Sequence, residues 1–261
     1  MIQNSSAMPP QTPQEIIAYI RTYYTLHQTD IRETVTYHPL LGTAAAQITL
    51  PHSPHIFCGT GQTAAAARAG AYLQSFTGLC RKLPHTASDA VICAGCSPDD
   101  AAVQGLSELL ARRATDRSGQ ISDAPLIPEE VLSGYRTAYR MYQLLKQAYG
   151  DRLTLRDISG SGIQLTAALL LTDAQTGTTA VTCCSHPDAG TALEHLLINA
   201  AHGSSFAGAR YFSGRDDALY LPAMLQKMRL SCCKVPIKDC SRAGIHMRQV
   251  SLLQSSKICC V

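Results

Sequence analysis

The sequence lacks the features that mark membrane, secreted and nucleic-acid-binding proteins. Its longest apolar run, residues 165–171, is far too short to cross a bilayer. The polar start, residues 1–14, has no basic segment followed by an apolar one, which argues against a signal peptide or a membrane anchor. The 22 basic and 19 acidic residues are scattered, so no block of like charge indicates a nucleic-acid partner. We therefore expect a cytoplasmic protein that binds neither a membrane nor nucleic acid.

A disulfide framework is also unnecessary, although the chain has 11 cysteines. With 261 residues, of which 46% are hydrophobic and 16% charged, the chain can bury one large core or two small ones without covalent cross-links. We interpret most of the cysteines as small buried hydrophobes or free thiols. Cys93 and Cys96 have the spacing of zinc ligands, but the sequence offers only loose second pairs, so a metal or redox role is less favoured.

Hydrophobic periodicity predicts that helices and strands alternate. Apolar positions at helical spacing predict helices over residues 13–28 and 128–149, with a polar loop over 116–123 between helices. Short apolar runs predict strands over residues 34–37, 46–50, 153–158, 164–172 and 178–184. We divide the chain into a lead-in of helix and strands over residues 1–55, a core over 56–222, and a C-terminal segment over 223–261 that packs on the core.

Three helical segments, each entered through a glycine or proline turn, are the most informative feature of the chain. They cover residues 64–80, 101–114 and 189–202, and we name them the signature helices. The second has the clearest local chemistry. Ser97 can cap the helix, Pro98 suits its first position, and Asp99 and Asp100 favour the positive end of the helix dipole.

The order of these turns and helices resembles the YcaO family from about residue 57 to residue 220. The resemblance rests on five motifs in the family's order, at residues 59–63, 94–112, 157–163, 186–196 and 213–217. Each motif alone is weak, whereas all five in order are specific. We therefore expect a mixed α/β domain of the YcaO type, in which a mixed β-sheet is covered by the signature helices.

This resemblance implies an enzyme that uses ATP and Mg2+ to phosphorylate a backbone amide oxygen of a peptide. A side chain or a sulfur donor then attacks, which gives an azoline or a thioamide. Magnesium ions that hold a triphosphate prefer carboxylate oxygens as ligands. In the family, these acids project from one face of the three helices.

Most of those acids are missing from this sequence. On the first signature helix, the family's acids and arginine fall on Gln74 and on neutral residues around it. Glu108 and Arg112 match an acid and the arginine on the second, while an acid and a glutamine on the third fall on Asn199 and His202. The resemblance thus implies a nucleotide site, with Glu108 as its remaining magnesium ligand, made of Gln74, Glu108, Arg112, Asn199, His202 and Arg215.

Simpler interpretations stay open for these residues. Glu108 and Arg112, four apart on a helix, can form an ordinary surface salt bridge. His202 can cap the end of its helix rather than act as a general base. Arg215 can pair with a neighbouring aspartate, and the turn at Gly59 and Gly61 is only a weak signal for phosphate binding.

Three functions are compatible with a depleted acidic site. The first, which we favour, is a catalytically impaired partner or scaffold for an active YcaO protein in peptide or protein backbone modification. The second is an active ATP-dependent enzyme with a rearranged metal site, in which Glu108 acts with Asp99, Asp157 or Glu194. The third is a module that binds a small molecule or a peptide. A homodimer is expected by analogy with the family.

Overall fold

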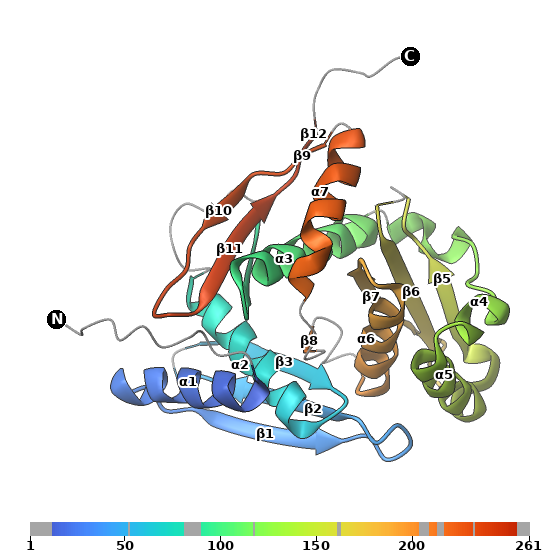
Figure 1. Cartoon of the computed structure of the whole chain (residues 1–261). Coiled ribbons are helices and arrows are strands. Elements are labelled where there is room, and N and C mark those ends of the chain that lie inside the picture. Colours follow the sequence, from blue (N-terminus) through green and yellow to red (C-terminus); the bar gives the residue numbers. More distant parts are fainter. Residues whose placement is uncertain are drawn as a thin grey trace.

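Helices and strands alternate along the chain in a computed structural model. The structure describes residues 12–51, 53–80, 90–116, 118–160, 163–203, 209–212, 217–231 and 233–254. The mixed α/β class predicted from the sequence is confirmed (Figure 1). Within these ranges, no helix combines the length and the apolar character needed to cross a membrane.

The first helix shows how strongly local sequence determines its start. Thr12 accepts a hydrogen bond from the backbone N–H of Glu15, whose carboxylate accepts one from the backbone N–H of Thr12. The α-helices of the described residues are α1 (Pro13–Leu26), α2 (Ala64–Cys80), α3 (Pro98–Asp116), α4 (Glu129–Ser133), α5 (Arg136–Tyr149), α6 (Ala189–Ala201) and α7 (Leu221–Leu230). Short 3-10 helices are η1 (Ser118–Asp123), η2 (Gly150–Arg152) and η4 (Asp217–Tyr220).

The strands form several sheets instead of the single sheet that we expected. In the first sheet, β1 (Arg32–Tyr37), β2 (Ala44–Thr49) and β3 (Ile56–Gly61) are antiparallel, and β8 (Arg210–Tyr211) is parallel to β3. The second contains β10 (Ile237–Asp239), β11 (His246–Ser251) and β4 (Ala90–Gly95). The third contains β5 (Leu153–Asp157), β6 (Leu165–Thr172) and β7 (Thr179–His186), and a small ladder joins β9 (Cys233–Lys234) to β12 (Leu253–Gln254).

Each signature helix follows a strand after a turn of two residues. β3 leads into α2, β4 into α3 and β7 into α6. In each turn, the second residue accepts a hydrogen bond from the backbone N–H three residues later, at 3.2 Å for Thr63, 3.1 Å for Ser97 and 2.7 Å for Asp188. The predicted cap at Ser97 is confirmed. The three helices therefore start in the same way, at the ends of three different strands.

Gly59 and Gly61 lie in β3, so the predicted glycine turn at this place is wrong. A Cβ atom on Gly59 would lie 2.2 Å from the carbonyl oxygen of Ala67 and from the backbone nitrogen of Ala71. A Cβ atom on Gly61 would lie 2.7 Å from the Cβ atom of Ala66. These glycines are required because α2 packs directly on the strand backbone, and they form no phosphate-binding loop.

Other boundaries also differ from those predicted. The helix expected over residues 128–149 is divided into α4 and α5, because Gly134 ends the first and Tyr135 lies outside helical geometry, with φ −114° and ψ 80°. The expected polar loop contains η1. The third signature helix is preceded by a longer strand than predicted, since β7 continues to His186.

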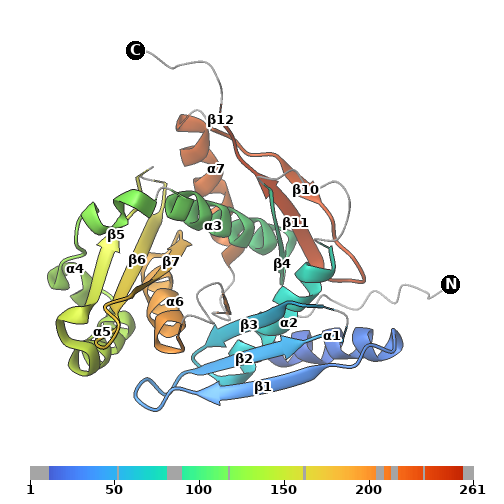
Figure 2. The same cartoon turned by 180° about the vertical axis from the view of Figure 1, so that it is seen from behind.

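The three signature helices belong to three different apolar cores. Phe76 of α2 packs with α1 and the first sheet, and Leu197 of α6 packs with α5 and the third sheet. Leu106 of α3 packs with α7 and the second sheet. Figure 2 shows these three parts of the molecule from behind. Because each helix has its apolar face in a separate core, the other faces of the helices are left to line a common space.

Candidate functional site

A cavity of about 760 Å³ lies where the signature helices meet, and we name it the central cavity. It receives side chains from α2, α3 and α6, and also from β4, β7, β8 and η4. Among the predicted site residues, four line this cavity: Gln74, Glu108, Arg112 and Asn199. The structure therefore brings these four together from helices far apart in sequence.

Glu108 and Arg112 form a direct ion pair on α3. Their side chains are 35% and 47% exposed, so the pair faces solvent at the edge of the cavity. The Cys93 thiol donates a hydrogen bond to the other oxygen of Glu108 at 3.2 Å. The carboxylate thus already has a positive partner and a hydrogen-bond donor. The surface salt bridge, one of the two interpretations above, is present in the structure.

Gln74 and Asn199 hold the fold together with their amide groups. The side-chain oxygen of Gln74 accepts a hydrogen bond from the backbone N–H of Cys58. Asn199 is 1% exposed and connects three segments, because it accepts from the Thr60 hydroxyl and donates to the carbonyl oxygen of Ala209 at 3.2 Å. Both amides therefore tie signature helices to β3 or to the segment before β8.

His202 does not line the central cavity with the four residues named above. It is the C-cap residue of α6, with Nε2 3.3 Å from the hydroxyl oxygen of Thr43 and its ring against that of His38. Burial and the nearby His38 lower its pKa to about 4, so the ring is neutral at physiological pH. Arg215 lies outside the described residues.

Two polar groups in the cavity were not predicted from the sequence. Asp217, which is 3% exposed, accepts a hydrogen bond from the side-chain amide of Gln104 at 3.0 Å. Its carboxylate also lies 3.1 Å from Nε2 of His186. Asp217 stands in the closing motif and His186 at the end of β7, but only the tertiary structure shows that they meet.

Cys184 and His195 form a second polar pair that the sequence did not reveal. Nε2 of His195 lies 2.9 Å from the carbonyl oxygen of Ala209, which can only accept, so this nitrogen carries the proton. Nδ1 is then the acceptor for the Cys184 thiol, 2.9 Å away. Burial lowers the pKa of His195 to about 4, helped by the nearby charges of His186 and Arg210, and burial raises that of Cys184. Both groups are thus neutral, and the thiol is not activated.

The spacing of α6 contains a signal that could have identified His195. Thr191, His195 and Asn199 are four residues apart, and all three line the central cavity. No comparable pattern predicts Arg210, which lines the cavity from β8. Its position depends on the pairing of β8 with β3.

The described residues do not fit a magnesium-bound triphosphate. Among them, no three His, Cys, Asp or Glu side chains converge in a way that could hold a metal ion. The cavity's acids are Glu108, Asp116 and Asp217. Glu108 is paired, Asp217 is buried against His186, and Asp116 is two helical turns from Glu108, or about 12 Å along the axis. Divalent cations require several oxygen ligands at one point.

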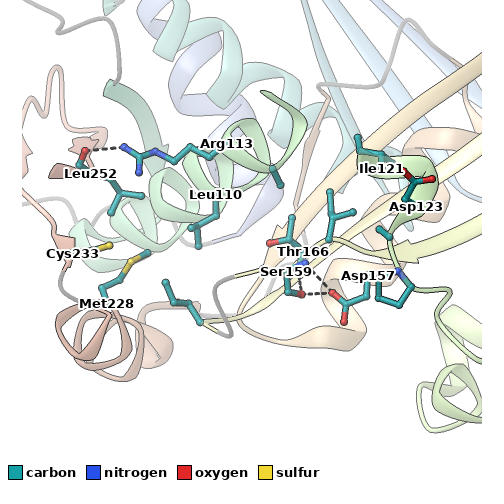
Figure 3. A pocket seen from close by; sticks show the side chains of 16 residues that line it. Leu110, Arg113, Ile121, Asp123, Asp157, Ser159, Thr166, Met228, Cys233 and Leu252 are labelled. Carbon is teal, nitrogen blue, oxygen red and sulfur yellow. Dashed lines mark hydrogen bonds between the residues drawn. The ribbon is translucent and has the colours of Figure 1, made fainter. Parts of the chain in front are cut away.

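The acids proposed for a rearranged metal site do not join Glu108. Asp157 lines a second cavity, of about 690 Å³, where Figure 3 shows it hydrogen-bonded to Ser159. Glu194 accepts hydrogen bonds from Gln62 and from the Tyr211 hydroxyl. Asp99 does not line the central cavity. These three acids therefore do not line the central cavity together with Glu108.

A family model described as YcaO cyclodehydratase, ATP- and Mg2+-binding, matches residues 91–231, which is more than half of the chain. The matched range includes β4, α3, the third sheet, α6 and α7. No curated protein matches the sequence.

Solved structures with the same fold include YcaO from Methanopyrus kandleri bound with AMPPCP and Mg2+. It has a TM-score of 0.67 and 13% identity, over 93% of this chain and 90% of that one. A heterocyclase in complex with substrate and cofactor has a TM-score of 0.64 and 10% identity, over 92% of this chain and 52% of that one. The E. coli microcin synthetase McbBCD complex with pro-MccB17 bound has a TM-score of 0.53 and 9% identity, over 86% of this chain and 87% of that one.

Proposed function

Since the chain belongs to the YcaO family, we propose that it takes part in peptide backbone modification as a partner or scaffold that does not itself phosphorylate the amide. The fold supports a place in such chemistry, because two similar structures are a heterocyclase with its substrate and a microcin synthetase with its pro-peptide. A partner role places the ATP-dependent step on another, active YcaO protein. A homodimer and a cytoplasmic location stay predictions.

The observation that carries this proposal is the state of the acids in the central cavity. Glu108 is paired with Arg112, and Asp217 is hydrogen-bonded to Gln104 beside His186. Neutral groups, among them Gln74 and Asn199, occupy positions where the family resemblance implies carboxylates. Without several free carboxylates, the cavity offers little compensation for the charge of magnesium ions around a triphosphate.

The alternative of an active enzyme retains one supporting observation. Asp217 lines the same cavity as Glu108, so two carboxylates from separate motifs do face a shared space. An active enzyme would have to release both from their present partners before they could hold a metal ion. Since each carboxylate has a short contact to a neighbour, we place this function second.

The test is to incubate the chain with ATP, Mg2+ and a cysteine-containing peptide. The release of phosphate and the mass of the peptide are then measured. We expect neither phosphate release nor loss of water from the peptide when this chain is present alone. When an active YcaO protein from the same cell is added, this chain should raise its rate or its peptide affinity. Turnover by this chain alone contradicts the proposal. The proposal is also contradicted if adding this chain changes neither the rate nor the peptide affinity of the active YcaO protein.

A further inference from the structure

Arg210 lines the central cavity with a positive charge that no described residue neutralises. Its Nε atom is buried and makes no hydrogen bond. Within the described part of the chain, no carboxylate forms an ion pair with its guanidinium group. A guanidinium keeps its charge at any physiological pH, and a buried donor without an acceptor costs free energy. The structure thus places beside the cavity a guanidinium whose charge no described carboxylate offsets.

The backbone of Arg210 is fixed where its side chain enters the cavity. Arg210 lies opposite Gly59 in the parallel pairing of β8 with β3. Its carbonyl oxygen would be 2.5 Å from a Cβ atom on Gly70, so α2 also packs closely against it. Strand and helix therefore hold this position from two sides. A guanidinium on a fixed backbone is suited to binding a ligand, since little conformational freedom is lost on binding.

The nearest polar neighbours do not neutralise this charge. His195 is neutral, because its Nε2 donates to Ala209 and its Nδ1 accepts from Cys184. Asn199 has its oxygen and its nitrogen engaged with Thr60 and Ala209. Of the cavity's carboxylates, Glu108 is paired with Arg112 and Asp217 contacts Gln104 and His186, while Asp116 forms no ion pair with Arg210. Among the described residues around it, Arg210 therefore has a donor that these neighbours leave unused.

We propose that the central cavity binds an anionic group, a phosphate or a carboxylate, on Arg210 without a magnesium ion. The planar guanidinium can donate two parallel hydrogen bonds to either group. The choice of cavity rests on the proposed function, but the binding mode differs from that of a metal-held triphosphate. A ligand held in this way needs no cluster of acids, which agrees with the residues that line the cavity.

The test is titration calorimetry of the purified chain in EDTA, with inorganic pyrophosphate and, separately, with citrate. We expect at least one of the two to bind, and Arg210→Gln to weaken that binding at least tenfold, which corresponds to about 1.4 kcal/mol. Tighter binding of pyrophosphate indicates a phosphate ligand, and tighter binding of citrate a carboxylate ligand. The matched control is Arg113→Gln, which should keep the affinity of the wild type. Arg113 lines the second cavity, where it donates to the carbonyl oxygen of Leu252 at 2.9 Å.

Circular dichroism and thermal unfolding show whether each variant is folded. If Arg210→Gln fails to fold, Arg210→Lys decides the question, because it keeps the charge but loses the planar pair of donors. An affinity reduced about threefold or more in Arg210→Lys supports the proposal. The proposal is overturned if neither anion binds in EDTA, if binding requires Mg2+, or if the Arg210 variants bind as the wild type does. These measurements need no peptide and no partner, so their failure is distinguishable from failure of the proposed function.

Discussion

The two faces of the signature helices differ in what they require from the sequence. The packed faces approach neighbouring backbone so closely that Gly59 has no room for a Cβ atom, and each helix contributes to its own apolar core. The cavity faces carry polar pairs, such as Glu108 with Arg112 and His195 with Cys184. The comparison teaches that the packed faces place strict limits on side-chain size, while the cavity faces use polar side chains either to tie segments together, as Asn199 does, or to pair with one another.

The largest expected effect is on the packed face. Gly59→Ala places a Cβ atom 2.2 Å from two backbone atoms of α2, so strand and helix must separate. We expect it to lower the free energy of unfolding by about 3 kcal/mol in urea denaturation. Gly134→Ala is the matched control, since its nearest neighbour is 3.4 Å away, and it should change stability by less than about 0.5 kcal/mol. Equal effects of the two variants would contradict the difference between the faces.

The next largest effect concerns His195, whose imidazole is neutral on the cavity face of α6. The pKa of His195 is about 4 in the folded protein, against an ordinary value of 6.5, so the unfolded chain binds more protons between these two pH values. Stability should therefore fall as pH decreases from about 6.5 to about 4, with a contribution from His195 of about 3 kcal/mol. His195→Gln should flatten this decline in unfolding curves measured across the window. Exposed His55 supplies the control, and a His55→Gln variant should follow the wild type. An unchanged slope in His195→Gln would show that the buried imidazole is not the cause.

The smallest expected effect concerns Glu108, the acid that remains at the positions where the family resemblance implies carboxylates. Glu108→Gln removes an ion pair that is partly exposed, so its change in unfolding free energy should stay below about 0.5 kcal/mol. Removal of a negative charge from an anion-binding cavity should strengthen pyrophosphate binding by up to about threefold. If Glu108 is a magnesium ligand, its loss should instead weaken pyrophosphate binding in a titration with Mg2+ present, and that result would return Glu108 to the role of a magnesium ligand.

The sequence predicted the features of this protein that depend on neighbouring residues. The cap at Ser97 with Pro98 after it, and the mixed α/β class, could be recognised because they follow from local chemistry. The strand position of Gly59 was missed, because the close approach of α2 that requires glycine is a tertiary contact.

The site was predicted in a similar, partial way. Helical spacing and family order brought out Gln74, Glu108, Arg112 and Asn199, all of which line the central cavity. Arg210, His186 and Asp217 were not recognised, since strand pairing and a distant turn place them there. Side chains that meet across separate cores leave no periodic pattern in a single sequence.

The central claim is that this cavity does not hold a magnesium-bound nucleotide. The most direct measurement is calorimetry of the wild-type chain with ATP, once with Mg2+ in excess and once in EDTA. The account predicts that Mg2+ leaves the affinity unchanged within about threefold, because the described residues of the cavity provide no set of converging carboxylates for the ion. An affinity at least tenfold higher with Mg2+, and lost in Glu108→Ala, would contradict it.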